Sequence, residues 1–263
     1  MKKTLSMLLA VLLLFSLLCT MTIANAETTY DILDVKDNIR TVGRTETTET
    51  GIACDWTASG IEFCADVEGD ISIKMTSSCQ DVNNKGTYNR DCYFTVYIDG
   101  VRQSYRARTM NGTYNVTVAQ SLPKGEHTIK VLKQNERSTT TVVMQDITMN
   151  GTFLAKPSDP EFIFECIGDS ITSGFGSLDT NNQASRYSDG TRTYAFITAE
   201  NFGAEARVTS QSGGTITGLY SQYIKNTRDN NDYDYSLKKP NVVTIAFGTN
   251  DGAKTVDYWQ TGI

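Results

Sequence analysis

Short stretches in which apolar and polar residues alternate dominate the first half of the chain. The runs 61–67 and 71–75 place apolar side chains at every second position, which is the period of a strand with one buried face. Residues 93–98 form another such run and end in Asp99-Gly100, a pair that predicts a hairpin turn because both residues tolerate positive φ. Later strands are predicted over 114–118, 127–132 and 141–147. Many short strands separated by turn residues indicate a β-sandwich.

The pattern changes in the second half of the chain. Two continuous apolar runs, 162–167 and 242–247, predict strands that are buried on both faces. A helical stretch is predicted over 193–202, and a short strand over 206–210. Buried strands separated by helical or loop segments indicate a parallel α/β sheet.

The segment 155–160 (AKPSDP) lies between the two patterns and contains two prolines. It is therefore predicted to be a linker. On this division a β-sandwich domain spans residues 27–154, and an α/β domain spans residues 161–263.

The first 26 residues have the composition of an export signal. Lys2 and Lys3 form a charged end, and residues 8–18 are a leucine-rich apolar stretch. Ala24 and Ala26 provide a small-x-small cleavage site. The apolar stretch is short for a membrane anchor. We therefore expect cleavage after Ala26 and a secreted protein.

The net charge of the chain limits the classes of partner that it is expected to bind. The formal net charge is −6, and removal of Lys2 and Lys3 with the signal leaves −8. An acidic chain without a basic cluster argues against nucleic acid and against anionic membranes. No second apolar stretch is long enough to span a bilayer. A neutral carbohydrate partner is compatible with this composition.

Cysteine and histidine usage limits the metal and redox chemistry. An exported chain can form disulfides, and cross-hairpin pairs Cys54/Cys64 and Cys79/Cys92 would leave Cys166 free in a buried strand. The alternative is that the five cysteines that remain after signal cleavage are all reduced and serve as small apolar side chains. With one histidine and no C-x-x-C motif, the sequence predicts no metal site of a common zinc type.

The first chemical motif, Gly168-Asp169-Ser170, follows the apolar run 162–167. A serine nucleophile needs an exposed position, a base and donors for the developing oxyanion. A neighbouring glycine lets the backbone turn tightly and leaves room for an acyl group. The alternative is that Asp169 and Ser170 only cap the helix that follows.

The second motif, Gly248-Thr249-Asn250-Asp251, follows the apolar run 242–247. Ligands of open parallel sheets bind at the carboxyl ends of the strands, so the Asn250 amide is predicted to face the same pocket as Ser170. A neutral amide there is a good oxyanion donor. An ordinary Asn-Asp-Gly turn is the alternative.

A pair of glycines, Gly213-Gly214, follows the predicted strand 206–210. Backbone N–H groups of this loop could supply a further oxyanion donor. Two glycines in a loop are common, so this motif carries little weight by itself.

The order of these motifs resembles the SGNH (GDSL-like) hydrolases. The resemblance implies that Ser170 is the nucleophile. It also implies an oxyanion hole formed by the Ser170 N–H, the Gly213 N–H and the Asn250 amide. Gly214 is the alternative to Gly213, because the register of the loop is open.

The upstream sequence resembles the jelly-roll domain of carbohydrate esterase family 2. The resemblance rests on residues 39–45 (IRTVGRT), 55–63 (DWTASGIEF), 96–100 (VYIDG) and 125–131 (GEHTIKV). That family joins a β-sandwich to an SGNH domain and removes O-acetyl groups from plant polysaccharides such as xylan and mannan. The resemblance implies an acetylated polysaccharide substrate and no cofactor.

The base of the reaction is where the sequence departs from the family. Family members carry a histidine near the C-terminus, often with an aspartate three residues earlier, and no such catalytic His/Asp is present in this chain. His127 lies upstream, in a predicted sandwich strand, and is interpreted as structural. We therefore expect a chain truncated within the α/β domain and inactive as a fragment. The second hypothesis is a non-catalytic carbohydrate-binding or surface protein on a degenerate esterase scaffold.

Overall fold

The computed structural model describes residues 26–79, 81–82, 88–89, 91–137, 140–179, 185–218, 223, 225, 232–236, 238–254 and 257–258. Residues 1–25 of the predicted export signal lie outside these ranges. None of the helices within the described ranges is both long and apolar enough to cross a bilayer.

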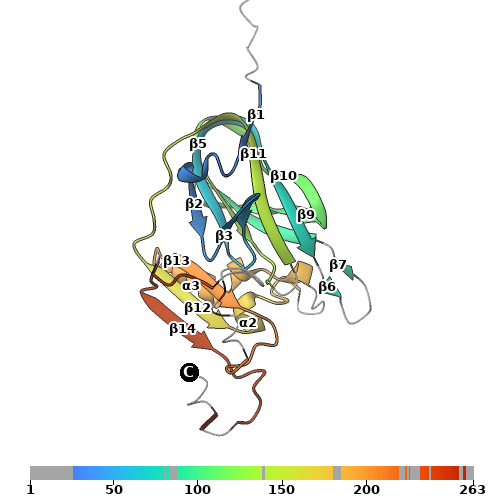
Figure 1. Ribbon diagram of the computed structural model, residues 1–263, viewed down its shortest axis with the longest axis vertical. Coiled ribbons are helices and arrows are strands. Elements are labelled where there is room, and N and C mark those ends of the chain that lie inside the picture. The colour runs from blue at the N-terminus through green and yellow to red at the C-terminus, as the bar shows by residue number, and fades with distance from the viewer. Residues whose placement is uncertain are drawn as a thin grey trace, which may run out of the picture.

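A large antiparallel sheet occupies the first part of the described chain (Figure 1). Its strands are β1 (Thr28–Asp31), β2 (Ile39–Val42), β3 (Glu46–Thr48), β4 (Gly51–Ala53), β5 (Gly60–Cys79), β8 (Asp91–Ile98), β9 (Val101–Met110), β10 (Gly112–Lys133) and β11 (Thr140–Phe153). The order is β3-β4-β11-β5-β10-β8-β9, with β1 paired to β11 and β2 to β5. A short 3-10 helix, η1 (Lys36–Asn38), precedes β2, and β6 (Asp81–Val82) pairs with β7 (Tyr88–Asn89).

The long strands correct one prediction. The expected separate strands 61–67 and 71–75 are parts of the single strand β5, and 114–118 and 127–132 are parts of β10. In β5, buried and exposed residues continue to alternate through the bend, because the extra residues are accommodated as bulges in its partner strand β10. The register with β5 shifts between Thr117 and Gly125. A β-bulge bends a strand without ending it, so turn-like residues need not mark a strand end.

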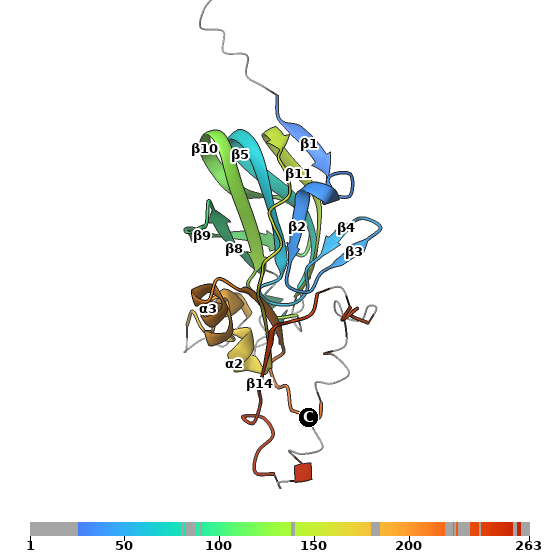
Figure 2. The same ribbon diagram turned by 90° about the vertical axis from the view of Figure 1, so that its left-hand side faces the viewer.

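The long strands bend, so that the sheet folds over on itself (Figures 1 and 2), and most of its buried apolar side chains form one cluster. The side chains of Phe63, Ile73 and Phe94 are 0 % exposed and belong to one buried cluster. The predicted hairpin at Asp99-Gly100 is confirmed: the two residues have φ of 53° and 76°, and Ile98 pairs with Val101 across the turn. The region is therefore the predicted β-sandwich.

The five cysteines of the described chain are free thiols. Cys54 lies in the buried sandwich cluster, whereas Cys64 is half-buried with its Sγ 3.4 Å from the Thr128 hydroxyl. Because Cys64 alternates with the buried Phe63 along β5, it faces away from Cys54. Cys79 and Cys92 are both buried in the core. Burial raises the pKa of the Cys92 thiol to about 12, so it stays protonated.

The second region contains three parallel strands below the sandwich (Figure 1). The strands β12 (Ile163–Gly168), β13 (Glu205–Ser210) and β14 (Val242–Ala246) lie in the order β13-β12-β14. The helices α2 (Ser170–Ser173) and α3 (Tyr194–Asn201) and the 3-10 turns η2 (Ser185–Tyr187) and η3 (Gly190–Arg192) connect β12 to β13. The predicted strand ranges and the predicted helix each match an observed element to within one residue.

Buried ion pairs join the two regions. Arg44, which follows β2, contacts Glu165 of β12 at 2.6 Å, and both side chains are 0 % exposed. Arg207 of β13 lies 3.3 Å from the other oxygen of the same carboxylate. Arg40 of β2 pairs with Glu205 at the start of β13. The sandwich therefore fixes β12 and β13, the strands that lead into the candidate site.

Candidate active site

The carboxyl ends of the three parallel strands lie side by side. Gly168 of β12 pairs with Ser210 of β13 and with Ala246 of β14. The residues that follow these three positions are therefore delivered to one edge of the sheet. They include all three motifs that the sequence singled out, and this edge is where ligands of parallel sheets bind.

Ser170 is the first residue of α2, directly after the end of β12. Asp169 is the N-cap of this helix, and its carboxylate accepts the Ile171 N–H at 3.0 Å. A side chain at position 168 would lie 2.1 Å from the Thr172 hydroxyl oxygen, so the turn requires glycine. Asp169 therefore does cap the helix, as the alternative proposed, while Ser170 is left partly exposed at the sheet edge.

Asn250 links the ends of the three strands. Its side-chain amide donates to the Gly214 carbonyl at 2.9 Å and lies 3.4 Å from Asp169 Oδ2. The structure thus brings Asn250 beside the residue that precedes Ser170. Asn250 sits in a turn that is closed by the hydrogen bond from Asp251 N–H to the Gly248 carbonyl at 3.2 Å.

The side chain of Asp251 stabilises this turn. Its side chain is 4 % exposed, and its carboxylate accepts the Ile216 N–H at 3.1 Å and the Tyr258 hydroxyl. The Ile216 contact ties the turn after β14 to the loop after β13. Asp251 therefore fixes the turn that carries Asn250.

The loop after β13 distinguishes the two candidate glycines. The Gly214 N–H donates to the Gln211 carbonyl at 3.0 Å, so it is already engaged in a turn. Gly213 has a φ of +76°, and a side chain built on it would meet nothing within 4 Å. The hydroxyls of Ser173 and Ser210 lie 2.9 Å apart and join the end of β13 to α2. The geometry favours Gly213 over Gly214 as a donor to a bound molecule.

His127 lies in β10, within the sandwich. Its Nδ1 is 2.8 Å from the Asp99 carboxylate, and its Nε2 is 2.9 Å from the Pro123 carbonyl. The hydrogen bond to Asp99 raises the pKa of the His127 imidazole. Both ring nitrogens are bound to sandwich residues, which agrees with the structural interpretation of this histidine.

Glu136, which follows β10, also contacts the site, although no sequence motif indicated it. This glutamate is 2 % exposed, and its carboxylate accepts the Ser212 N–H at 2.8 Å. The sandwich thus reaches the loop that carries Gly213. The one available signal was the polar run Gln134-Asn135-Glu136-Arg137 directly after a buried strand, and a polar run there ordinarily indicates a solvated loop.

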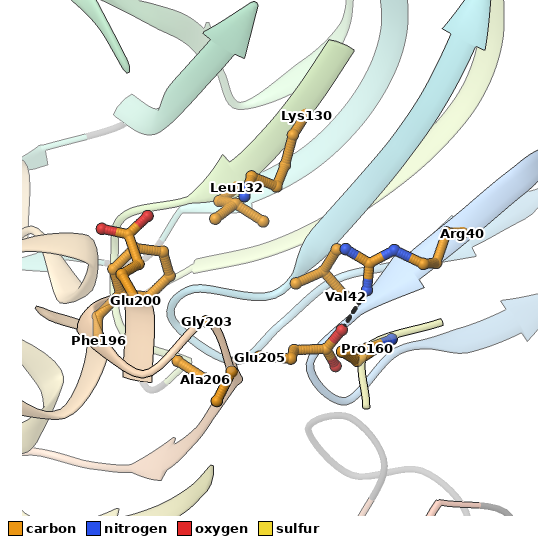
Figure 3. Close-up of a pocket in the computed structure, with 11 residues that line it drawn as sticks. Arg40, Val42, Lys130, Leu132, Pro160, Phe196, Glu200, Gly203, Glu205 and Ala206 are labelled. Carbon is orange, nitrogen blue, oxygen red and sulfur yellow. Dashed lines mark hydrogen bonds and ion pairs between the residues drawn. The ribbon is translucent and has the colours of Figure 1, made fainter. Parts of the chain in front are cut away.

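A groove of about 300 Å3 opens between the two regions (Figure 3). It is lined by Arg40, Lys130, Phe196, Glu200 and Glu205, among others. Glu205 begins β13, so the groove lies at the amino ends of the parallel strands, at the opposite end from Ser170. Within the described residues no group of three potential metal-ligating side chains comes together.

Two family descriptions match the chain in succession. Residues 41–157 match "Carbohydrate esterase 2 N-terminal", and residues 164–261 match "GDSL-like Lipase/Acylhydrolase". The first covers most of the sandwich, and the second begins in β12 and includes Ser170 and Asn250. The second region of the chain is thus similar to the GDSL-like lipases and acylhydrolases.

Two known proteins are similar to this chain over most of its length. The curated Cellulase/esterase CelE of Acetivibrio thermocellus is 28 % identical over 217 residues, which are 76 % of this chain and 25 % of that protein. This chain therefore spans about a quarter of the length of that relative. A family two carbohydrate esterase from Clostridium thermocellum, solved in complex with cellohexaose, is 25 % identical with a TM-score of 0.73. That match covers 82 % of this chain and 67 % of the other.

Two further solved structures share the fold. A family two carbohydrate esterase from Cellvibrio japonicus is 18 % identical with a TM-score of 0.74, over 90 % of this chain and 72 % of that one. An acetyl xylan esterase from Butyrivibrio proteoclasticus is 20 % identical with a TM-score of 0.74, over 86 % of this chain and 65 % of that one. The chain therefore carries a match to the N-terminal domain of carbohydrate esterase 2, followed by a match to a GDSL-like domain, and it shares its fold with family two carbohydrate esterases.

Proposed function

We propose that the protein is a secreted carbohydrate esterase that removes O-acetyl groups from plant polysaccharide such as xylan or mannan. The observation that carries the proposal is the meeting of three motifs at one sheet edge. Ser170 lies on a helix N-terminus, and the Asn250 amide contacts both Asp169 and the loop of Gly213. An exposed serine beside neutral donors is the arrangement that acyl transfer requires. The three parallel strands are then part of a layered α/β hydrolase domain.

In the proposed reaction the Ser170 hydroxyl oxygen attacks the carbonyl carbon of an O-acetyl ester. The Ser170 N–H, the Gly213 N–H and the Asn250 amide stabilise the negative charge that develops on the carbonyl oxygen. The sugar hydroxyl leaves with a proton, and acetyl-Ser170 forms. Water then attacks the acetyl group, releases acetate and restores the serine. No metal or organic cofactor takes part in this scheme.

The proton transfers of this scheme lack an imidazole beside Ser170. His127 is the one histidine of the sequence, and the sandwich holds both of its nitrogens. We propose that this chain by itself turns over slowly for that reason. Donors for the oxyanion still stabilise the charge that develops when Ser170 attacks an ester without a base, so a slow, residual Ser170-dependent activity is expected.

Hydrolysis of p-nitrophenyl acetate and acetate release from acetylated xylan test the proposal. The chain is compared with Ser170→Ala, which removes the nucleophile and leaves the fold intact because Ser170 is partly exposed. We expect slow release that depends on Ser170 and disappears into the buffer background in the variant. Equal rates for the two proteins would refute an esterase function.

The isolation of His127 from Ser170 also favours a second candidate, a non-catalytic carbohydrate-binding protein on this scaffold. Calorimetric titration with cellohexaose or xylohexaose separates the two. Saturable binding together with equal hydrolysis by the chain and Ser170→Ala would support the binding protein. Ser170-dependent hydrolysis would exclude it.

A further inference from the structure

The loop after β13 has one backbone donor that differs from its neighbours. The Gln211 N–H donates to the Gly168 carbonyl at 3.2 Å, and the Gly214 N–H donates to the Gln211 carbonyl at 3.0 Å. The Ser212 N–H donates to Glu136 at 2.8 Å. Across these four residues of the described chain, only the Gly213 N–H is left available to a bound molecule. Two of the three occupied donors are satisfied within the second region, and the third is satisfied by the sandwich.

Glu136 is held rigidly where it meets this loop. Lys133 is 0 % exposed, and its ammonium donates to the Asp55, Asn135 and Glu136 carbonyls at 2.6, 2.8 and 3.3 Å. Asn135 in turn accepts the Tyr93 N–H at 2.7 Å. These bonds clamp the backbone around Glu136, so its carboxylate is a fixed acceptor rather than a mobile surface group.

We propose that Glu136 is a positioning residue for the oxyanion hole: by holding the Ser212 N–H, the sandwich aims the adjacent Gly213 N–H at the substrate carbonyl oxygen. The proposal rests on the esterase function proposed above. A Ser-Gly-Gly loop has a large conformational freedom of its own, whereas oxyanion donors work only when they are preorganised. A charge-assisted hydrogen bond is stronger than a neutral one and is well suited to restrain such a loop.

The role of Glu136 is orientation and not charge. A carboxylate close to an oxyanion hole opposes the negative charge of the transition state, so its Coulombic effect on the reaction is unfavourable. Glutamine keeps an oxygen that can accept the Ser212 N–H and lacks the charge. Glu136→Gln is therefore expected to retain the full kcat of the chain or exceed it, whereas Glu136→Ala is expected to lower kcat by up to about 100-fold with little change in KM.

A matched control comes from Glu205, at the other end of β13. Its carboxylate also crosses between the regions, pairs with Arg40 and accepts the Gly43 N–H at 3.2 Å. Glu205→Ala weakens the contact between the regions without touching the loop of Gly213. If Glu136 acted only by holding the regions together, Glu205→Ala would lower kcat in the same way.

The experiment measures p-nitrophenyl acetate kinetics and amide hydrogen exchange over residues 208–216 for the chain, Glu136→Ala, Glu136→Gln and Glu205→Ala. We expect faster exchange in this segment and a lower kcat for Glu136→Ala alone, with rescue of both by glutamine. Unchanged kcat and exchange in Glu136→Ala, or an equal kcat loss in Glu205→Ala, would overturn the inference. Equal hydrolysis by the chain and Ser170→Ala would instead refute the esterase function. In that case hydrogen exchange still tests the contact between Glu136 and the Ser212 N–H, and unchanged exchange in Glu136→Ala would refute it.

Discussion

The sandwich and the parallel-strand region bury their apolar residues in different ways. The sandwich encloses its own core, in which Phe63, Ile73 and Phe94 are 0 % exposed. The second cluster is shared: Cys166 and Val208 of the parallel strands pack with Val42, Tyr97 and Leu132 of the sandwich. On the far side, Val242, Val243 and Ile245 of β14 are 41 %, 47 % and 49 % exposed. The sandwich therefore supports itself, whereas the region that carries Ser170 relies on the sandwich.

Two isoleucines in strands give the sharpest contrast between the regions. Ile73→Ala removes buried methylenes from the sandwich core and is expected to lower the free energy of unfolding by about 2–5 kcal/mol. Ile245→Ala acts on a half-exposed side chain of β14. It is expected to change the free energy of unfolding by no more than about 0.5 kcal/mol. Urea unfolding of both variants measures the difference. Equal losses would mean that β14 is as well buried as β5.

The second largest effect is expected at the ion pair between Arg44 of the sandwich and Glu165 of the parallel-strand region. Arg44→Ala removes a partner of Glu165 and leaves a buried carboxylate short of compensation, which costs about 3–5 kcal/mol for such pairs. Because Glu165 lies in β12, we expect faster hydrogen exchange over residues 163–168 and 205–210. Exchange over β5 should stay as in the unchanged chain. Equal acceleration in β5 would show that the sandwich depends on the second region as well.

A substitution of Asn250 tests its proposed role as an oxyanion donor. Loss of one oxyanion donor lowers kcat by about 10²–10³-fold in other serine hydrolases, and Asn250→Ala is expected to do the same for Ser170-dependent hydrolysis. The matched control is Asn241→Ala, because Asn241 accepts the Ile163 N–H at the opposite end of the sheet, at 2.9 Å. A kcat for Asn250→Ala within the range of the control would remove Asn250 from the oxyanion hole.

The smallest effect concerns His127 and the pH dependence of the sandwich. The hydrogen bond to Asp99 raises the pKa of His127. Burial alone would raise the pKa of Asp99, but hydrogen bonds from the Thr128 N–H and His127 outweigh it and lower that pKa. The stabilisation from His127 is thus fully present below its unfolded pKa of about 6.5 and is lost as the pH rises through the folded pKa.

Thermal unfolding of the chain and His127→Gln tests this dependence. An exposed pair of this kind contributes about 0.2–1 kcal/mol, so the chain should exceed the variant slightly in Tm at pH 5 and lose the advantage by pH 8. The contribution of Asp99 has the opposite direction and is lost as the pH falls through its folded pKa. Ser170-dependent hydrolysis should be unaffected by the substitution. A fall in kcat for His127→Gln would instead assign the histidine a catalytic role.

The sequence predicted local features well and long-range contacts poorly. Apolar runs located β12, β13 and β14, and the motifs after them converge because parallel strands share a carboxyl edge. The merging of two predicted strands into β5 was missed, because a bulged bend leaves the alternation intact on both sides. The pairing of Arg44 with Glu165 joins residues 121 positions apart, so no local pattern could reveal it. Glu136 was missed for a related reason, since charged residues after a strand ordinarily face water.

The most direct test of Ser170 as the nucleophile is to locate the acetyl group after brief exposure of the chain to p-nitrophenyl acetate. The reaction is stopped with acid, and the chain is digested and analysed by peptide mass spectrometry, with Ser170→Ala treated in parallel. We expect one acetyl group on the peptide that contains Ser170 and none on the corresponding peptide of Ser170→Ala. Acetyl groups distributed over surface lysines, equally in both proteins, would contradict it.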